Sequence, residues 1–123
     1  MKTQIDHDTM EDIVMNTYSD EDAFNAALNY FKGDELAARV WVNKYALKDS
    51  SGNVYELTPD DMHWRLAREI ARIEKQYPNP LSVEQIYELF KNFTYIVPQG
   101  GPMTGIGNQF QIASLSNCFV IGN

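Results

Sequence analysis

The sequence has one cysteine, few basic residues and no long apolar run, and each shortage excludes a class of protein. Cys118 stands alone among 123 residues, so an internal disulfide is excluded and we expect a reducing, cytoplasmic compartment. No stretch approaches the roughly 18 uninterrupted apolar residues of a membrane span, and the polar, acidic N-terminus differs from a secretory signal. Ten lysines and arginines stand against seventeen acids, so we expect neither nucleic acid nor a membrane as a partner.

Charge is distributed unevenly along the chain. Residues 1–35 hold nine acids and two lysines and so carry the whole net charge of −7, which we interpret as a solvated face. Residues 36–91 are balanced, with eight charges of each sign. Residues 92–123 contain no Asp, Glu, Lys, Arg or His. The chain therefore divides into an acidic part, a balanced part and an uncharged part.

Residues 19–92 have the capping residues and the apolar spacing of about four helices. A polar residue suited to begin a helix occurs four times, at Ser19, Asp34, Thr58 and Ser82. Gly33 and the YPNP sequence at residues 77–80 are stop signals. Residues 1–18 lack a clear period and are predicted to form a loosely ordered lead-in. We therefore predict a helical domain over residues 19–92.

The apolar positions of these helices predict a common core. Neither His63 nor His7 has a partner at metal-ligand spacing, so we predict no metal site, and we expect His63 on a helix surface. Trp64 is predicted to be a core or interface residue. The predicted core residues are Phe24, Leu28, Val40, Trp41, Leu66, Ile70, Ile86 and Phe90.

After Asn92 the sequence changes character. Residues 95–97 are a short extended run, and the glycines of residues 100–107 predict a loop with tight turns rather than a phosphate-binding fingerprint. Residues 111–121 are typical of a strand, apolar and uncharged, with Cys118 among them. A strand of this kind is typically buried, with neighbouring elements on both sides. We therefore expect it to pair with a missing C-terminal portion, a complementary chain or a second copy.

Two segments of this uncharged part resemble the beginning of the ten-stranded catalytic barrel of ribonucleotide reductases. They are residues 113–121, ASLSNCFVI, and residues 97–103, VPQGGPM. The helical sequences LAARVW (36–41) and DMHWRLA (61–67) resemble the N-terminal helical domain of that family. The resemblance implies a mainly α fold, in which residues 93–123 form the loop and first strand of an incomplete α/β barrel.

The resemblance also implies a chemistry, the reduction of ribonucleotides, such as ribonucleoside diphosphates, to the deoxyribonucleotides that DNA replication consumes. A cysteine at the position of Cys118 faces the ribose in this family and pairs with a second cysteine, while a third becomes a thiyl radical. The Cys118 thiol would help to expel the 2′ hydroxyl as water, and the thiol pair would supply two electrons and close into a disulfide. Asn117 and Gly101 fall at the family's substrate contacts. Proton donation requires a neutral thiol, and no cation stands nearby in sequence to favour a thiolate.

One cysteine cannot supply two electrons by disulfide formation, so we expect the chain to be inactive alone. It would need the remainder of the catalytic subunit or a complementary chain. We expect no cofactor within these residues and adenosylcobalamin in the full enzyme, with a metal-bearing radical subunit as the alternative. The competing interpretation is an acidic helical module that binds another protein without catalysis. In that case Cys118 would be a packed core residue, and the sequence downstream of Asn123 would discriminate the two.

Overall fold

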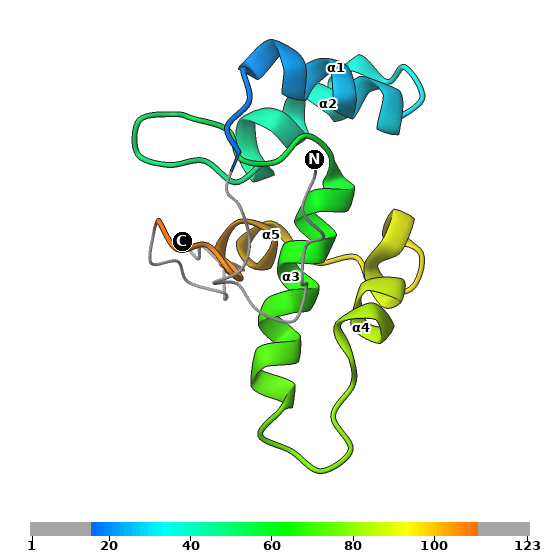
Figure 1. Ribbon diagram of the computed structural model, residues 1–123. Coiled ribbons are helices and arrows are strands. Elements are labelled where there is room, and N and C mark those ends of the chain that lie inside the picture. The colour runs from blue at the N-terminus through cyan, green and yellow to red at the C-terminus, as the bar shows by residue number, and fades with distance from the viewer. Residues whose placement is uncertain (1–15, 111–123) are drawn as a thin grey trace, which may run out of the picture.

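The computed structural model describes residues 16–110, and helices dominate this part of the chain (Figure 1). The predicted mainly helical fold is confirmed over this range, where the only β structure is two isolated bridges that pair Val54 with Tyr18 and with Lys48. The predicted strand around Cys118 lies outside the described residues. The elements are α1 (Asp20–Tyr30), α2 (Glu35–Val40), the π-helical turn η1 (Trp41–Tyr45), α3 (Pro59–Glu74), α4 (Val83–Phe90), the 3-10 turn η2 (Lys91–Phe93) and α5 (Gly100–Gly105).

The long helix α3 is the central element. It packs against α4, which returns alongside it after the turn that contains the predicted YPNP stop (Figure 1). α1, α2 and η1 pack together at the N-terminal end of α3, where Trp41 Nε1 donates a hydrogen bond to Met62 Sδ at 3.5 Å. α5 contacts η1 and lies on the flank of α3 opposite α4 (Figure 1).

The four helices predicted between residues 19 and 92 begin where the capping residues indicated. Ser19, Asp34, Thr58 and Ser82 each directly precede a helix. Ser82 and Gln85 form a capping box, a reciprocal pair of hydrogen bonds at the start of a helix. Ser82 Oγ accepts from Gln85 N at 3.1 Å, and Ser82 N donates to Gln85 Oε1 at 2.8 Å. These bonds satisfy backbone groups that a helix leaves free at its start. The helical boundaries are therefore set by local sequence.

The predicted core is confirmed in its main members. Trp41, Leu66, Ile86 and Phe90 are buried, and three of the other predicted residues pack against them while partly exposed. His63 contradicts its prediction, because its side chain is 0% exposed instead of lying on the helix surface. The three partly exposed residues are Phe24, Leu28 and Ile70. Val40 is half-buried.

Residues 100–108 pack on the helices, whereas residues 94–97 are exposed. α5 forms where the glycines had predicted a loop, and Pro102 is tolerated there because it lies in the first turn, where an N–H has no helical acceptor. Met103 and Ile106 pack against the core, and the ring of Phe110 stacks on Tyr55 with centroids 5.0 Å apart. At the other end of the described range, Tyr18 N donates to Val54 O at 2.8 Å, so residue 18 is held by a backbone contact.

Leu66→Ala should lower the free energy of unfolding by about 2–5 kcal/mol, because it leaves a cavity in the fully buried core. Leu36→Ala is the matched control: Leu36 is 74% exposed, so its truncation should change the free energy by less than about 0.5 kcal/mol. Urea unfolding of the two variants and the wild type measures both values. Equal losses in the two variants would contradict the packing described above.

Candidate functional site

The three residues predicted to contact the substrate are described only in part. Cys118 and Asn117 lie outside the described residues. Gly101 is buried in the first turn of α5. Of the predicted site, the described residues therefore contain the segment around Gly101 and the side chains that hold it in place.

Arg65 of α3 holds this segment. Its side chain is 1% exposed, and its Nε donates to Glu56 Oε2 at 2.9 Å. Nη2 donates to Glu56 Oε1 at 3.3 Å and to Met103 O at 2.7 Å, while Nη1 donates to Ile106 O at 2.6 Å. Every nitrogen of the guanidinium is thus engaged, by a carboxylate on one side and by two backbone carbonyls on the other.

These two carbonyls lie at the C-terminal end of α5, where a helix leaves its last carbonyl groups without partners. Arg65 satisfies Met103 O and Ile106 O, and Asn108 satisfies two more, because its Nδ2 donates to Thr104 O at 2.9 Å and its N–H to Gly105 O at 3.2 Å. A cation at this end also complements the helix dipole. Arg65 therefore acts as a C-terminal cap for α5.

Gly107 follows immediately and approaches Arg65 closely. A Cβ at this position would lie 2.9 Å from Arg65 Cγ, and the backbone has φ of +72°, a conformation that side chains disfavour. Glycine is therefore required here for two reasons, the left-handed backbone and the space taken by the arginine stem.

Glu56 connects the same ion pair to a third segment. Its Oε1 also accepts from Leu47 N at 2.9 Å, so the carboxylate joins both arms of the loop between η1 and α3. The tip of that loop is organised by Asp49, whose Oδ1 accepts from Ser51 N at 2.9 Å and Asn53 N at 3.0 Å. A hydrogen bond from the Asn53 side chain is the main cause that lowers the pKa of the Asp49 carboxyl, and these backbone hydrogen bonds lower it further. The loop, α3 and α5 are thus linked through one carboxylate and one guanidinium.

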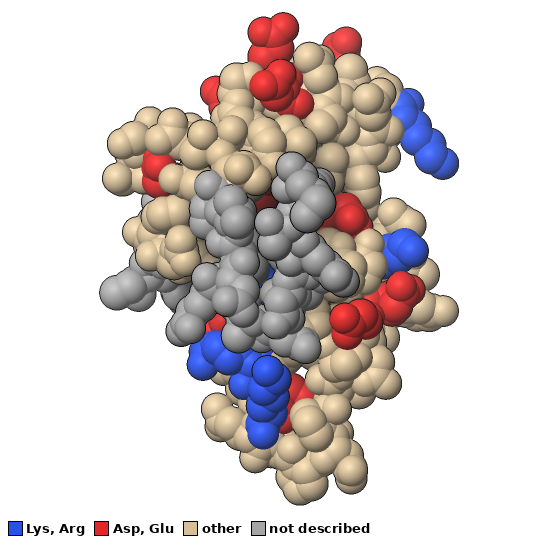
Figure 2. All heavy atoms as spheres, in the orientation of Figure 1, with Lys and Arg blue, Asp and Glu red and all other residues tan. Residues whose placement is uncertain are grey.

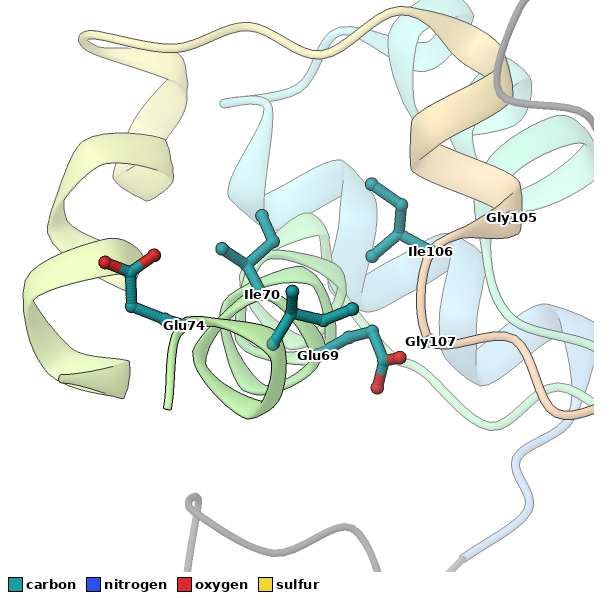
Figure 3. Close-up of a pocket in the computed structure, with 7 residues that line it drawn as sticks. Glu69, Ile70, Glu74, Gly105, Ile106 and Gly107 are labelled. Atoms are coloured by element: carbon teal, nitrogen blue, oxygen red, sulfur yellow. The ribbon is translucent and has the colours of Figure 1, made fainter. Parts of the chain in front are cut away.

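A pocket of about 400 Å³ lies beside the anchored segment, between α3 and residues 105–107. Figure 3 shows Ile106 reaching from the end of α5 toward Ile70 of α3, with the carboxylates of Glu69 and Glu74 to either side. Both carboxylates already have partners, because Glu69 pairs with Arg72 at 2.6 Å and Glu74 Oε1 accepts from Leu81 N at 3.5 Å. The pocket is therefore an apolar hollow rather than a pair of free acids.

A second buried polar group lies on the other flank of α3. His63 stacks against Phe90 at 6.1 Å between centroids and meets Phe93 edge-on at 4.6 Å. Neither of its ring nitrogens has a hydrogen-bond partner among the described residues. Desolvation by burial lowers the pKa of His63 to about 4; Asp60 opposes this shift and Arg65 adds to it. The imidazole is therefore neutral at physiological pH.

Asp60 and two tyrosines lie near this histidine. Tyr87 of α4 donates a hydrogen bond from its hydroxyl to Asp60 Oδ1 and stacks on Trp64. Burial and then the Asp60 contact raise the pKa of Tyr87. Burial and the charge of Asp60 likewise raise the pKa of Tyr30. The Tyr87–Asp60 hydrogen bond and the stacking of Tyr87 on Trp64 fasten α4 to α3, and both tyrosine hydroxyls stay protonated at neutral pH.

Sequence reasoning missed the burial of Arg65, Glu56 and His63. For His63 a signal was available, since it falls at helical spacing from Pro59, Leu66 and Ile70 on the apolar stripe of α3. For Arg65 and Glu56 no local pattern distinguishes them from surface charges. Their burial depends on where residues 100–107 pack, which is a tertiary contact.

Within residues 16–110, no three His, Cys, Asp or Glu side chains gather closely enough to hold a metal ion. Over the same range, no helix combines the length and the apolar character needed to span a bilayer. Figure 2 shows acidic side chains gathered at the end of the molecule formed by α1, whose first turn contains Asp20, Glu21 and Asp22. These acids lie on the outside, as the charge distribution predicted.

Comparison with protein families gives one match. The family model described as "Ribonucleotide reductase, all-alpha domain" matches residues 31–101, more than half of the chain. The matched range contains α2, α3 and α4 and reaches the first turn of α5. Neither the curated proteins nor the solved structures gave a match.

Glu56→Gln should lower the free energy of unfolding by about 3–5 kcal/mol, because it leaves the buried Arg65 guanidinium without a countercharge. The matched control is Glu69→Gln, which removes the partner of the exposed Arg72 and should cost at most about 1 kcal/mol. Urea unfolding at neutral pH separates the two. A Glu56→Gln variant as stable as the control would show that the buried pair is not needed.

The buried histidine predicts a dependence of stability on acid. The folded state lowers the pKa of His63 from 6.5 to about 4, so its neutral form is favoured and protonation favours unfolding. The contribution of His63 to the free energy of unfolding is complete above pH 6.5 and is lost between pH 6.5 and about 4. The total loss is on the order of 3 kcal/mol. His63→Leu should flatten this part of the stability curve. The carboxylates titrate in both proteins, so their effect cancels when the two curves of stability against pH are compared. Superimposable curves for wild type and His63→Leu would show that His63 does not have the lowered pKa assigned to it.

Proposed function

Because the chain belongs to the ribonucleotide reductase all-alpha domain family, we propose that it is the helical N-terminal part of the catalytic large subunit of such an enzyme. The observation that carries this proposal is the family match over residues 31–101. The mainly helical fold of residues 16–110 agrees with an all-alpha domain. The activity we propose for the complete enzyme is the reduction of ribonucleotides to deoxyribonucleotides.

In this proposal Cys118 carries the part of the chemistry that the chain itself contributes. A thiyl radical on a cysteine outside these 123 residues removes the 3′ hydrogen atom of the ribose. The Cys118 thiol gives its proton to the 2′ hydroxyl, which leaves as water. A second cysteine, which lies outside this chain, supplies the hydrogen that C2′ gains, and its sulfur and that of Cys118 close into a disulfide, which accounts for the two electrons. The 3′ hydrogen atom then returns to the ribose, and the thiyl radical is restored. The uncharged sequence of residues 92–123 supports this role, since a thiol without nearby cations keeps its proton at neutral pH.

Asn117 and Gly101 are proposed as the substrate contacts. Asn117 precedes the reacting cysteine, and its amide can donate to a ribose or phosphate oxygen. Gly101 offers only its backbone, so any contact it makes is to its N–H or its carbonyl. The sequence resemblance supports these assignments.

The proposed partners are the remainder of the catalytic subunit or a complementary chain, together with a ribonucleotide. The sequence resemblance favours adenosylcobalamin as the source of the radical, and a metal-bearing radical subunit is the alternative. We assign no residue between 16 and 110 to either group.

Cys118→Ser, placed in the completed reductase, should abolish multiple turnover while nucleotide binding persists. A serine hydroxyl cannot form the disulfide that supplies the electrons. Deoxyribonucleotide formation in the presence of dithiol measures turnover, and equilibrium binding of the nucleotide is the control for folding. Normal multiple turnover by the variant would show that Cys118 is only a packing residue.

The 123-residue chain alone should form no deoxyribonucleotide with adenosylcobalamin, nucleotide effectors and a dithiol present, because it contains one of the three thiols required. Product above the blank would contradict the assigned chemistry. A chain that binds another protein tightly but no nucleotide, even when completed, would support the binding-module interpretation.

A further inference from the structure

The contacts of Arg65 bear on the substrate contact proposed for Gly101. We propose that Arg65 is a positioning residue: it holds residues 100–107 in the place from which Gly101 contacts the nucleotide, an inference that rests on the function proposed above. The proposal concerns how the segment is fixed, since the partners of Arg65 among residues 16–110 are Glu56 and two backbone carbonyls.

α5 cannot fix its own position. It has six residues, among them three glycines and a proline, and a helix this short is not stable in isolation. No charged residue occurs between residues 92 and 123 that could hold the segment by an ion pair of its own. Its place therefore depends on contacts from other elements.

The guanidinium of Arg65 has the geometry to fix the segment. Glu56 takes Nε and one side of Nη2, which leaves the outer edge of the planar fork facing α5. That edge makes the 2.7 Å bond to Met103 O and the 2.6 Å bond to Ile106 O. Two bonds from one rigid plane fix both the distance and the rotation of the segment. A lysine in this place is a single point charge and cannot reproduce the fork.

The position that Arg65 imposes on the end of α5 is transmitted to Gly101. Thr104 Oγ1 lies 3.1 Å from Gly100 O and 3.2 Å from Gly101 O, within donating distance of both, and Met103 N donates to Gln99 O at 3.1 Å. These bonds tie the start of α5 to the turn that Arg65 caps. A displacement at Met103 and Ile106 therefore moves Gly101 with it.

The test uses two variants of the completed enzyme that disturb the anchor in different ways. Arg65→Lys keeps the charge but removes the fork. Gly107→Ala keeps Arg65 intact but forces a Cβ against its stem, where the nearest carbon is 2.9 Å away. The matched control is Arg72→Lys, which changes the exposed ion pair between Arg72 and Glu69 further along α3.

Both anchor variants should raise the KM for the ribonucleotide by about tenfold or more while kcat falls less, because misplacing a substrate contact weakens binding. Hydrogen exchange should show faster exchange of the amides of residues 103–108 with unchanged protection in α1 and α4. Arg72→Lys should resemble the wild type in both measurements.

Each outcome decides the proposal. If exchange of residues 103–108 rises in the anchor variants but KM stays at the wild-type value, Arg65 only stabilises the fold and the positioning role is wrong. A lower apparent kcat at constant KM, the sign of a reduced active fraction, would lead to the same conclusion. If the wild-type enzyme binds no ribonucleotide, the proposed function falls, and the positioning role falls with it.

Discussion

The buried ion pair between Arg65 and Glu56 is the constraint on which the arrangement of the described residues depends. Removing two charges from water costs several kcal/mol per ion unless the remaining donors and acceptors are satisfied. Here Leu47 N donates to the carboxylate of Glu56, and Met103 O and Ile106 O accept from the guanidinium of Arg65. The pair is therefore stable only when the loop before α3 and the segment after Gly100 are both in place, which couples regions distant in sequence into one packing arrangement.

What could be predicted from the sequence is what local physics determines. Helix starts at Ser19 and Ser82 follow from side-chain caps, and the core residues of α3 and α4 follow from helical spacing. α5 was not predicted, because its glycines favour a loop by propensity, whereas the Arg65 cap and the packing of the segment, which are tertiary contacts, stabilise a helical turn there. The burial of Arg65 could not be predicted either, since a charge on a helix is ordinarily exposed and only a tertiary partner reverses that expectation. The predicted substrate and redox residues beyond position 110 are supported by sequence resemblance.

The division of the chain into charged and uncharged parts corresponds to a division of roles in the proposed enzyme. In residues 16–110 the buried polar groups, including His63 and the Tyr87–Asp60 pair, fasten helices to one another. The thiol proposed to react, Cys118, belongs to the uncharged part, where no cation stands nearby in sequence to favour a thiolate. In the proposed enzyme the helical domain would therefore contribute position, and the segment that follows it would contribute the reacting group.

The central claim, that this chain supplies a redox-active thiol to a ribonucleotide reductase, is tested most directly by a single turnover of the completed enzyme without external dithiol. After the reaction, the protein is digested under non-reducing conditions and its cysteine peptides are identified by mass spectrometry. The account predicts that deoxyribonucleotide appears together with a disulfide that joins the peptide containing Cys118 to a second cysteine peptide. Product formed while Cys118 remains a free thiol would contradict it.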